Sequence, residues 1–221
     1  MRRIVGCVFQ TLDGVMQAPG GPSEDPSDGF RYGGWQMTFS DETARAAIEK
    51  LLTPPYALLL GRRTYDIFAS FWPYVQGEEA EIGKAFTAAD KYVLTRGDQP
   101  LEWENSHRLP DIDGLAEVKR GDGPDLVVWG SSMIYPALLS SGLLDRLVLL
   151  TYPLVLGEGK RLFGDGTPAR TFKLVEQRAG SRGCVATTFE PAGALKTGSF
   201  AAEAPSEAEL TRREKVAEGT W

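Results

Sequence analysis

Three short apolar runs, each followed at once by glycine or threonine and polar residues, constrain the fold of this chain most. The runs are Leu-Leu-Leu at 58–60, Tyr-Val-Leu at 92–94 and Val-Val-Trp at 127–129. Uninterrupted apolar runs of this length are typical of strands buried on both faces. Such strands occur mainly in parallel sheets that helices cover on both sides. The three runs therefore predict an α/β fold.

Segments with helical periodicity alternate with the predicted strands. After a strand at 4–9, a loop rich in glycine and proline extends from Gln10 to about Phe39, and long loops in compact domains tend to be functional. Ser40 is then expected to cap a helix that ends before Pro54-Pro55. The remaining pattern predicts strands at 56–60, 91–94, weakly near Glu102, and at 126–129, with helices from Gly61 to about Phe71, at 115–120 and at 132–140.

The last strands are separated by turns instead of helices. They are expected at 146–152, 172–177 and 184–190. Alternating helices and strands followed by consecutive strands indicate a mixed, mostly parallel sheet flanked by helices, with antiparallel C-terminal strands.

Composition changes sharply near Pro191, where large apolar side chains become scarce. We interpret residues 1–190 as one domain and residues 191–221 as a C-terminal tail, with a helix expected at 206–217. A solvated tail and a subunit contact are both compatible with this composition.

The charge balance argues against two classes of partner. The chain has 30 acidic and 24 basic residues and a net charge of −6, whereas nucleic-acid binders and proteins that bind anionic membranes usually carry the opposite balance. Cys7, Cys184 and the single His107 are too few and too widely spaced for a zinc site of the CxxC type, so no metal is expected. Few cysteines and no apolar span indicate a cytoplasmic protein without a membrane segment.

The residues that follow the three apolar runs suit an anion. Gly-Arg-Arg-Thr follows at 61–64, Thr-Arg-Gly at 95–97 and Gly-Ser-Ser at 130–132. Ligands bind at the carboxyl ends of strands in open α/β sheets, and free N–H groups at helix starts attract anions. Arg62 and Arg63 oppose the helix dipole there, which a bound phosphate would offset. With Thr95 and Arg96 they are expected to hold a phosphate monoester such as the 2′-phosphate of NADP; pairing with acids of the long loop is the alternative.

Six separated blocks give this sequence a family resemblance. These blocks occur along residues 1–190 in the same order as in the dihydrofolate-reductase-like family, which the sequence therefore resembles. That family includes the reductase domain of riboflavin biosynthesis. The blocks are Thr-Leu-Asp-Gly-Val-Met at 11–16, Ala-Pro-Gly-Gly at 18–21, Leu-Gly-Arg-Arg-Thr-Tyr at 60–65 with Phe-Trp-Pro at 71–73, Trp-Gly-Ser-Ser at 129–132, Gly-Leu-Leu-Asp at 142–145, and Pro-Leu-Val-Leu-Gly-Glu-Gly-Lys-Arg-Leu-Phe at 153–163.

The resemblance implies a reductase fold that binds NADPH across the carboxyl ends of its central strands. It also implies a small-molecule substrate and a homodimer that involves the late strands. The residues that would contact the cofactor are Leu12, Ala18, Gly61, Arg62, Arg63, Thr64, Thr95, Arg96, Gly130, Ser131, Ser132, Met133, Leu156 and Gly157, with Gly159 facing the same pocket.

Five residues are candidates for chemical roles beyond cofactor binding. Asp13 and Asp41 are the candidate catalytic acids, and the alternatives are a turn residue before Gly14 and a helix cap. Trp35, Glu158 and Lys160 are candidate substrate contacts. We expect an NADPH-dependent oxidoreductase that transfers a hydride to a small heterocyclic or carbonyl substrate. The alternative is a non-catalytic NADP(H)-binding or sensor protein.

Overall fold

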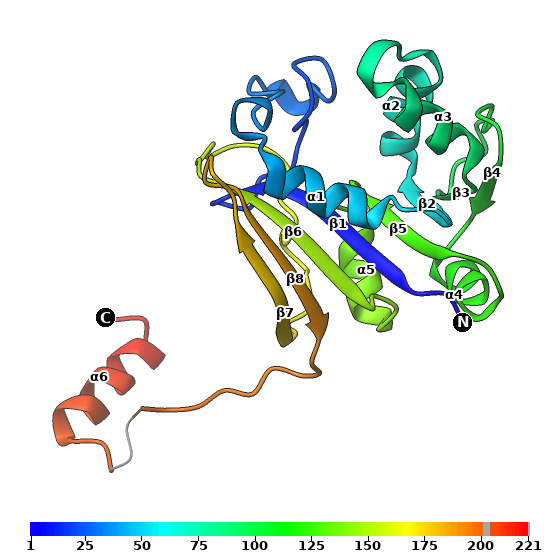
Figure 1. The fold of residues 1–221 in the computed structure, drawn as a ribbon. Coiled ribbons are helices and arrows are strands. Elements are labelled where there is room, and N and C mark those ends of the chain that lie inside the picture. The colour runs from blue at the N-terminus through cyan, green and yellow to red at the C-terminus, as the bar shows by residue number, and fades with distance from the viewer. Residues whose placement is uncertain (201–203, 221) are drawn as a thin grey trace.

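The computed structural model describes residues 1–200 and 204–220, and its centre is an eight-stranded sheet (Figure 1). The strand order is β4-β3-β2-β5-β1-β6-β8-β7. Neighbouring strands are parallel from β4 to β6, while β8 runs antiparallel to both β6 and β7. This confirms the predicted mixed sheet. The strands are β1 (Ile4–Thr11), β2 (Tyr56–Gly61), β3 (Lys91–Leu94), β4 (Ser106–Leu109), β5 (Asp125–Trp129), β6 (Arg146–Tyr152), β7 (Phe172–Ala179) and β8 (Val185–Pro191).

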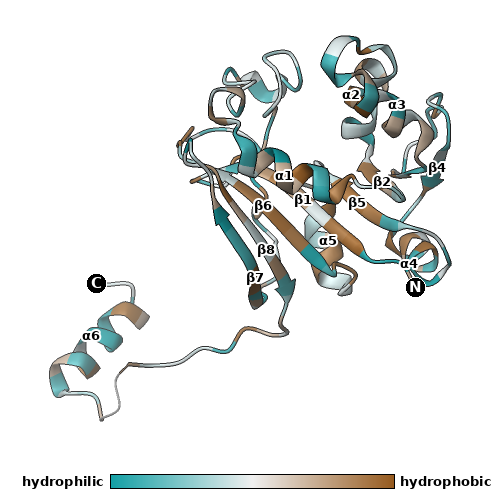
Figure 2. Ribbon diagram, viewed as in Figure 1, coloured by the Kyte–Doolittle hydropathy of each residue, from teal (hydrophilic) through white to brown (hydrophobic). Residues whose placement is uncertain are grey.

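Helices cover both faces of the sheet, as apolar strands require. The helices are α1 (Glu42–Leu51), α2 (Arg62–Phe71), α3 (Ala80–Ala88), α4 (Ile112–Arg120), α5 (Ile134–Ser141) and α6 (Glu207–Ala217). Side chains of α1, α2 and α3 join one core cluster, and those of α4 and α5 join the other. The central strands β1, β5 and β6 are strongly apolar along their length (Figure 2). Burial on both faces therefore explains the uninterrupted apolar runs.

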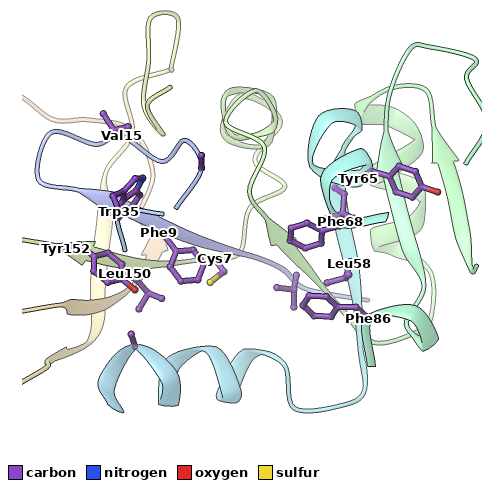
Figure 3. Close-up of a cluster of buried hydrophobic side chains, with 14 of the residues drawn as sticks. Cys7, Phe9, Val15, Trp35, Leu58, Tyr65, Phe68, Phe86, Leu150 and Tyr152 are labelled. Carbon is purple, nitrogen blue, oxygen red and sulfur yellow. The ribbon is translucent and has the colours of Figure 1, made fainter. Parts of the chain in front are cut away.

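Aromatic rings fill the core between the sheet and helices α2 and α3 (Figure 3). Phe86 of α3 stacks on Phe68 of α2 with ring centroids 5.8 Å apart, and Trp72 lies 4.9 Å from Phe86. Trp129, at the end of β5, packs between Phe86 and Phe9 at 6.1 and 5.5 Å. These contacts fix α2 next to the carboxyl ends of the central strands.

The structure corrects several predicted boundaries. Asp41, not Ser40, caps α1, because its carboxylate accepts hydrogen bonds from the first-turn backbone. The weak strand expected near Glu102 is β4, four residues later, and α5 begins at Ile134 instead of 132. Helix α3 had no predicted counterpart.

A lysine explains why α3 is stable although its sequence pattern is weak. The Lys91 ammonium group donates hydrogen bonds of 2.7–2.8 Å to the carbonyls of Phe86, Thr87 and Ala89, and the Lys91 side chain is fully buried. It thereby satisfies carbonyl groups that a helix C-terminus leaves unpaired. This interaction depends on packing between β3 and α3, so local periodicity could not indicate it.

The C-terminal segment leaves the sheet after β8. Residues 192–194 still hydrogen-bond to Thr171, and α6 then lies apart from the sheet (Figure 1). Its bounds agree with the helix expected at 206–217, and its side chains are mostly exposed. Within the described residues, no helix is both long and apolar enough to cross a bilayer.

Candidate cofactor and substrate cleft

A cavity of about 560 Å³ opens at the carboxyl ends of β1, β2 and β5. Cavities of this size commonly hold a small molecule or part of a cofactor. Its apolar wall includes Phe9, Phe68 and Trp129, and Cys7 also lines it. Burial raises the pKa of the Cys7 thiol to about 12, so this sulfur is a neutral wall group and not a nucleophile.

Ser131 joins the two strand–helix junctions at the cavity. Its hydroxyl oxygen accepts a hydrogen bond from the Gly61 N–H at 2.8 Å and lies 2.7 Å from the Thr64 hydroxyl oxygen. A Cβ atom at Gly61 would lie 2.6 Å from that oxygen, so a larger residue would not fit. Gly130 adopts a φ of +71°, which favours glycine. Gly61 and Gly130, one at each junction, both line the cavity.

The two predicted arginines point to different partners. The Arg62 guanidinium bonds to Asp66 at 2.9 Å and to the Gln99 carbonyl at 2.8 Å. Arg63 instead reaches the long loop, where it lies 3.7 Å from the Asp25 carboxylate and 3.3 Å from the Ser27 hydroxyl. No side chain caps α2, so its first-turn N–H groups remain available to a ligand.

Thr95 and Arg96 do not line the cavity. The Thr95 hydroxyl accepts a hydrogen bond from the Gly97 N–H at 3.1 Å, and Arg96 is exposed. The predicted clasp of both arginines with Thr95 and Arg96 around one phosphate is thus not assembled in this structure.

The long loop packs against the core through Trp35. The Trp35 indole N–H donates to the Gln17 carbonyl at 2.8 Å, and its ring lies edge-on to Tyr152 with centroids 5.5 Å apart. Trp35 is buried and does not line the cavity. Its position holds Gln17 and Ala18 at the cavity wall, which is an indirect contribution to the site.

Asp13 ties the first turn of the chain to the segment after β6. Its carboxylate accepts hydrogen bonds from the Leu156 and Gly157 N–H groups at 3.2 and 2.9 Å and from the Thr11 hydroxyl at 2.6 Å. Arg161 lies 3.5 Å away. Burial by itself raises the pKa of Asp13, but these hydrogen bonds outweigh it and lower that pKa to about 2. At neutral pH Asp13 therefore has no proton to donate.

Asp41 is engaged in the same way at the start of α1. One carboxylate oxygen accepts from the N–H groups of Thr43 and Ala44 at 3.1 and 3.2 Å, and the other accepts from the Arg182 N–H at 3.0 Å. Asp41 is buried and lies outside the cavity lining. The contacts are those of a helix cap that also holds the β7–β8 turn.

Glu158 and Lys160 lie close in sequence but face different surroundings. Glu158 is exposed and pairs with Arg31 at 3.3 Å. Lys160 lines the cavity and its ammonium group lies 2.6 Å from the Asp25 carboxylate.

The structure thus divides the predicted site residues into two groups. Those that line the cavity are Ala18, Gly61, Arg62, Arg63, Thr64, Gly130, Ser131, Ser132, Met133 and Lys160. Those that do not are Leu12, Asp13, Trp35, Asp41, Thr95, Arg96, Leu156, Gly157, Glu158 and Gly159.

Three acids of the long loop, Glu24, Asp25 and Asp28, also line the cavity and were not predicted. Glu24 accepts hydrogen bonds from the Gly20 and Gly21 N–H groups at 2.7 and 3.3 Å, and burial raises its pKa above the ordinary value. Asp25 bridges Lys160 and Arg63. The only sequence signal for these acids was the acidic, proline-containing stretch at 22–28 inside an unusually long loop.

Among residues 1–200 and 204–220, no group of three or more His, Cys, Asp or Glu side chains is placed to hold a metal ion.

Comparison with known proteins gives a family and a fold. Residues 2–186 match the family model of the RibD C-terminal domain. The uncharacterized protein YyaP of Bacillus subtilis (strain 168) is 26% identical over 198 residues, which cover 85% of this chain and 94% of that protein.

Solved structures with the same fold include three reductase-like proteins of low identity. A putative riboflavin biosynthesis protein from Shewanella sp. PV-4 is 19% identical, with a TM-score of 0.58 and coverage of 86% of this chain and 99% of that one. Dihydrofolate reductase from Enterococcus faecalis, complexed with NADP(H) and RAB-propyl, is 16% identical, with a TM-score of 0.53 and coverage of 86% and 96%. A pyrimidine reductase-like protein from Corynebacterium diphtheriae is 12% identical, with a TM-score of 0.55 and coverage of 86% and 92%. The predicted dihydrofolate-reductase-like fold is confirmed.

Proposed function

The chain belongs to the RibD C-terminal domain family, and on that premise we propose that it is an NADPH-dependent oxidoreductase that reduces a small heterocyclic or carbonyl substrate. The observation that carries this proposal is the cavity at the carboxyl ends of β1, β2 and β5, which Gly61, Gly130, Arg63 and Lys160 line together. Ligands of open α/β sheets bind at this edge. The NADP(H) complex of the Enterococcus dihydrofolate reductase adds support from a protein with the same fold.

The residues of the cavity fit a dinucleotide. Gly61 and Gly130 line the cavity where a pyrophosphate would lie, and the uncapped start of α2 attracts negative charge. Arg63 and Lys160 would hold phosphate oxygens, while Ala18 and Phe9 would form the wall for a flat ring. NADPH would supply a hydride, that is two electrons and one hydrogen nucleus, to the carbon of a C=N or C=O bond.

A separate proton must reach the nitrogen or oxygen of that bond. Asp13, Asp41 and Glu24 all accept backbone hydrogen bonds, but Asp13 and Asp41 lie outside the cavity lining. Glu24 lines the cavity, and burial raises its pKa, so a larger fraction of it is protonated than of an exposed glutamate. We therefore assign proton delivery to Glu24.

A non-catalytic NADP(H)-binding or sensor protein is the second candidate. The engagement of both predicted catalytic acids in structural hydrogen bonds favours it. In that case the cavity would bind NADPH, but no substrate would be reduced.

We also propose a cytoplasmic homodimer. Strand β7 is an edge strand of the sheet, and Leu174 and Val175 on it are 47% and 46% exposed. Exposed apolar edge strands are suited to pairing with another chain. Light scattering tests this assembly. The wild type should have the mass of a dimer, and Leu174→Lys should have the mass of a monomer.

Fluorescence titration followed by turnover assays tests the function. NADPH bound in the cavity next to Trp129 should quench tryptophan emission with micromolar affinity, and NADH should bind much more weakly. Equal, millimolar binding of both cofactors would exclude the assignment. Oxidation of NADPH with pyrimidine ribosyl phosphates, dihydrofolate or quinones, with a defined product, would separate the reductase from the sensor protein.

A further inference from the structure

All the negative charge that lines the cavity, within the described residues, comes from one short stretch of the long loop. The lining acids are Glu24, Asp25 and Asp28, and the lining cations are Arg62, Arg63 and Lys160. The cations come from two separate parts of the chain, Arg62 and Arg63 from α2 and Lys160 from the segment after β6. The loop acid Asp25 therefore offsets the charges of Arg63 and Lys160, whereas Arg62 pairs with Asp66 of its own helix.

Asp25 makes the closest of these charge contacts. Its carboxylate lies 2.6 Å from the Lys160 ammonium and 3.7 Å from the Arg63 guanidinium, and its side chain is only 13% exposed. The Ser27 hydroxyl donates to the same carboxylate and accepts hydrogen bonds from both cations. One carboxylate thus occupies the space between two cations that belong to distant parts of the chain.

Asp25 is held in its ionised form. Burial by itself raises the pKa of Asp25, but hydrogen bonds from Lys160 and Ser27 and the ammonium charge outweigh it and lower that pKa. Asp28 differs, since its side chain is 83% exposed and its carboxylate lies 4.0 Å from the Lys160 ammonium, farther than that of Asp25. Asp25 is therefore the buried, ionised carboxylate with which an anionic ligand would compete for the two cations.

We propose that Asp25 is an internal competitor for the anionic group of the ligand, and that a phosphate displaces it from Arg63 and Lys160. This inference rests on the proposed function, because the ligand is taken to be a dinucleotide with its phosphates in this cavity. A phosphate carries more charge and more acceptor oxygens than a carboxylate, so it can replace Asp25 on both cations. Two anions kept side by side would instead repel each other in a partly buried site.

The loop can release Asp25 at low cost. Residues 22–29 are mostly exposed, and Pro22 and Gly29 bound the segment. The segment is also held by hydrogen bonds of 3.0 Å from the Gln17 side-chain amide to the carbonyls of Asp25 and Ser27. At its start, the Gly20 and Gly21 N–H groups hold the Glu24 carboxylate at 2.7 and 3.3 Å. Burial of Phe30 anchors the loop beyond this segment. Movement of 25–29 can therefore release Asp25 while Glu24 and the core stay in place.

Competition makes the ligand affinity a difference between two interactions. A group with one negative charge gains little by replacing Asp25, whereas a pyrophosphate or phosphate monoester gains more. Asp25 therefore raises selectivity for highly charged phosphate ligands and lowers their absolute affinity.

Calorimetric titration of Asp25→Asn with inorganic pyrophosphate and with NADPH tests this inference. The variant should bind both about tenfold more tightly than the wild type, because loss of the charge-assisted contact frees both cations. Asp28→Asn is the matched control in the same loop and should change affinity much less. In Asp25→Asn/Lys160→Met the gain should disappear, which separates competition from a general loosening of the loop.

Hydrogen exchange of the wild type supplies a second readout. Pyrophosphate should increase exchange at residues 22–29 if the loop leaves the cations. Equal or weaker binding by Asp25→Asn, or increased protection of 22–29, would overturn the proposal and make Asp25 a ligand contact or a structural acid.

If Asp25→Asn binds pyrophosphate more tightly but no variant binds or oxidises NADPH, the proposed function fails and the competitor role stands. If NADPH is oxidised and Asp25→Asn shows no gain, only the competitor role fails.

Discussion

The Ser131 hydroxyl oxygen lies 2.8 Å from the Gly61 backbone nitrogen, although the two residues follow different strands. The contact ties the β5–α5 turn to the start of α2 at the site where the cofactor phosphates are expected. Ser131→Ala should leave the Gly61 N–H without a partner and destabilise the protein by about 1–2 kcal/mol. It should also weaken NADPH binding, because the two junctions lose their fixed separation. Urea unfolding and cofactor titration measure both effects. Ser132→Ala, which leaves this contact intact, should retain wild-type stability.

Asp13 should stabilise the fold in a pH-dependent way. Its pKa is about 2 in the folded protein and 3.8 in the reference state, so the unfolded chain binds the proton more readily. The stabilisation is therefore present above pH 3.8 and is lost as pH falls through about 2. Asp13→Asn should lower the free energy of unfolding at neutral pH by about 1–2 kcal/mol. The free energy of unfolding of this variant should also depend less on pH in the acid range. An unchanged pH dependence would show that the hydrogen bonds from Leu156 and Gly157 to Asp13 do not stabilise the fold.

Asp41 should act as a helix cap and not as an acid in the reaction. Asp41→Ala should cost about 1–2 kcal/mol, since the N–H groups of Thr43 and Ala44 lose their acceptor. Asp41→Ser keeps a capping oxygen and should recover part of that loss. Both variants should keep the wild-type kcat for NADPH oxidation at a temperature where they are folded. A large loss of kcat in stable Asp41→Ser would instead assign a catalytic role.

Glu24 should affect turnover more than cofactor affinity. Glu24→Gln keeps an oxygen for the Gly20 and Gly21 N–H groups but removes the proton that the reaction needs. We expect kcat to fall by about 10²–10⁴-fold, the range for loss of general acid catalysis. In the wild type kcat should decrease as pH rises through the raised pKa of Glu24, and the variant should lose this dependence. Steady-state kinetics across pH, with NADPH titration as a control, decide the point.

The tail should be dispensable for folding. A chain truncated after residue 197 keeps the hydrogen bonds of residues 192–194 to Thr171 and removes α6, which is exposed on all sides. Its Tm and its NADPH affinity should equal those of the full chain. Light scattering of both chains tests whether the tail joins subunits, and loss of a dimer on truncation would make it an assembly element.

Much of the fold could be predicted from the sequence because its signals are local. A strand buried on both faces must be apolar at every position, so 58–60 and 127–129 indicate the parallel centre without tertiary information. Glycine followed by polar residues similarly marked the junctions at Gly61 and Gly130. Helix α3 and strand β4 were missed or displaced because their stability depends on distant partners, such as Lys91 under the end of α3.

The sequence by itself determined the alternating α/β order and the set of residues that can meet a phosphate at the strand ends. Only the tertiary structure decided which of those residues share a cavity and what they contact there. Arg63 and Lys160 share the carboxylate of Asp25, and Arg63 does not join Arg96 around a phosphate site. Asp13 and Asp41 accept hydrogen bonds from backbone N–H groups. The physical reason is that an apolar strand pattern is set by each residue's own burial. An ion pair or a shifted pKa depends instead on groups that the folded chain brings together from far apart in the sequence.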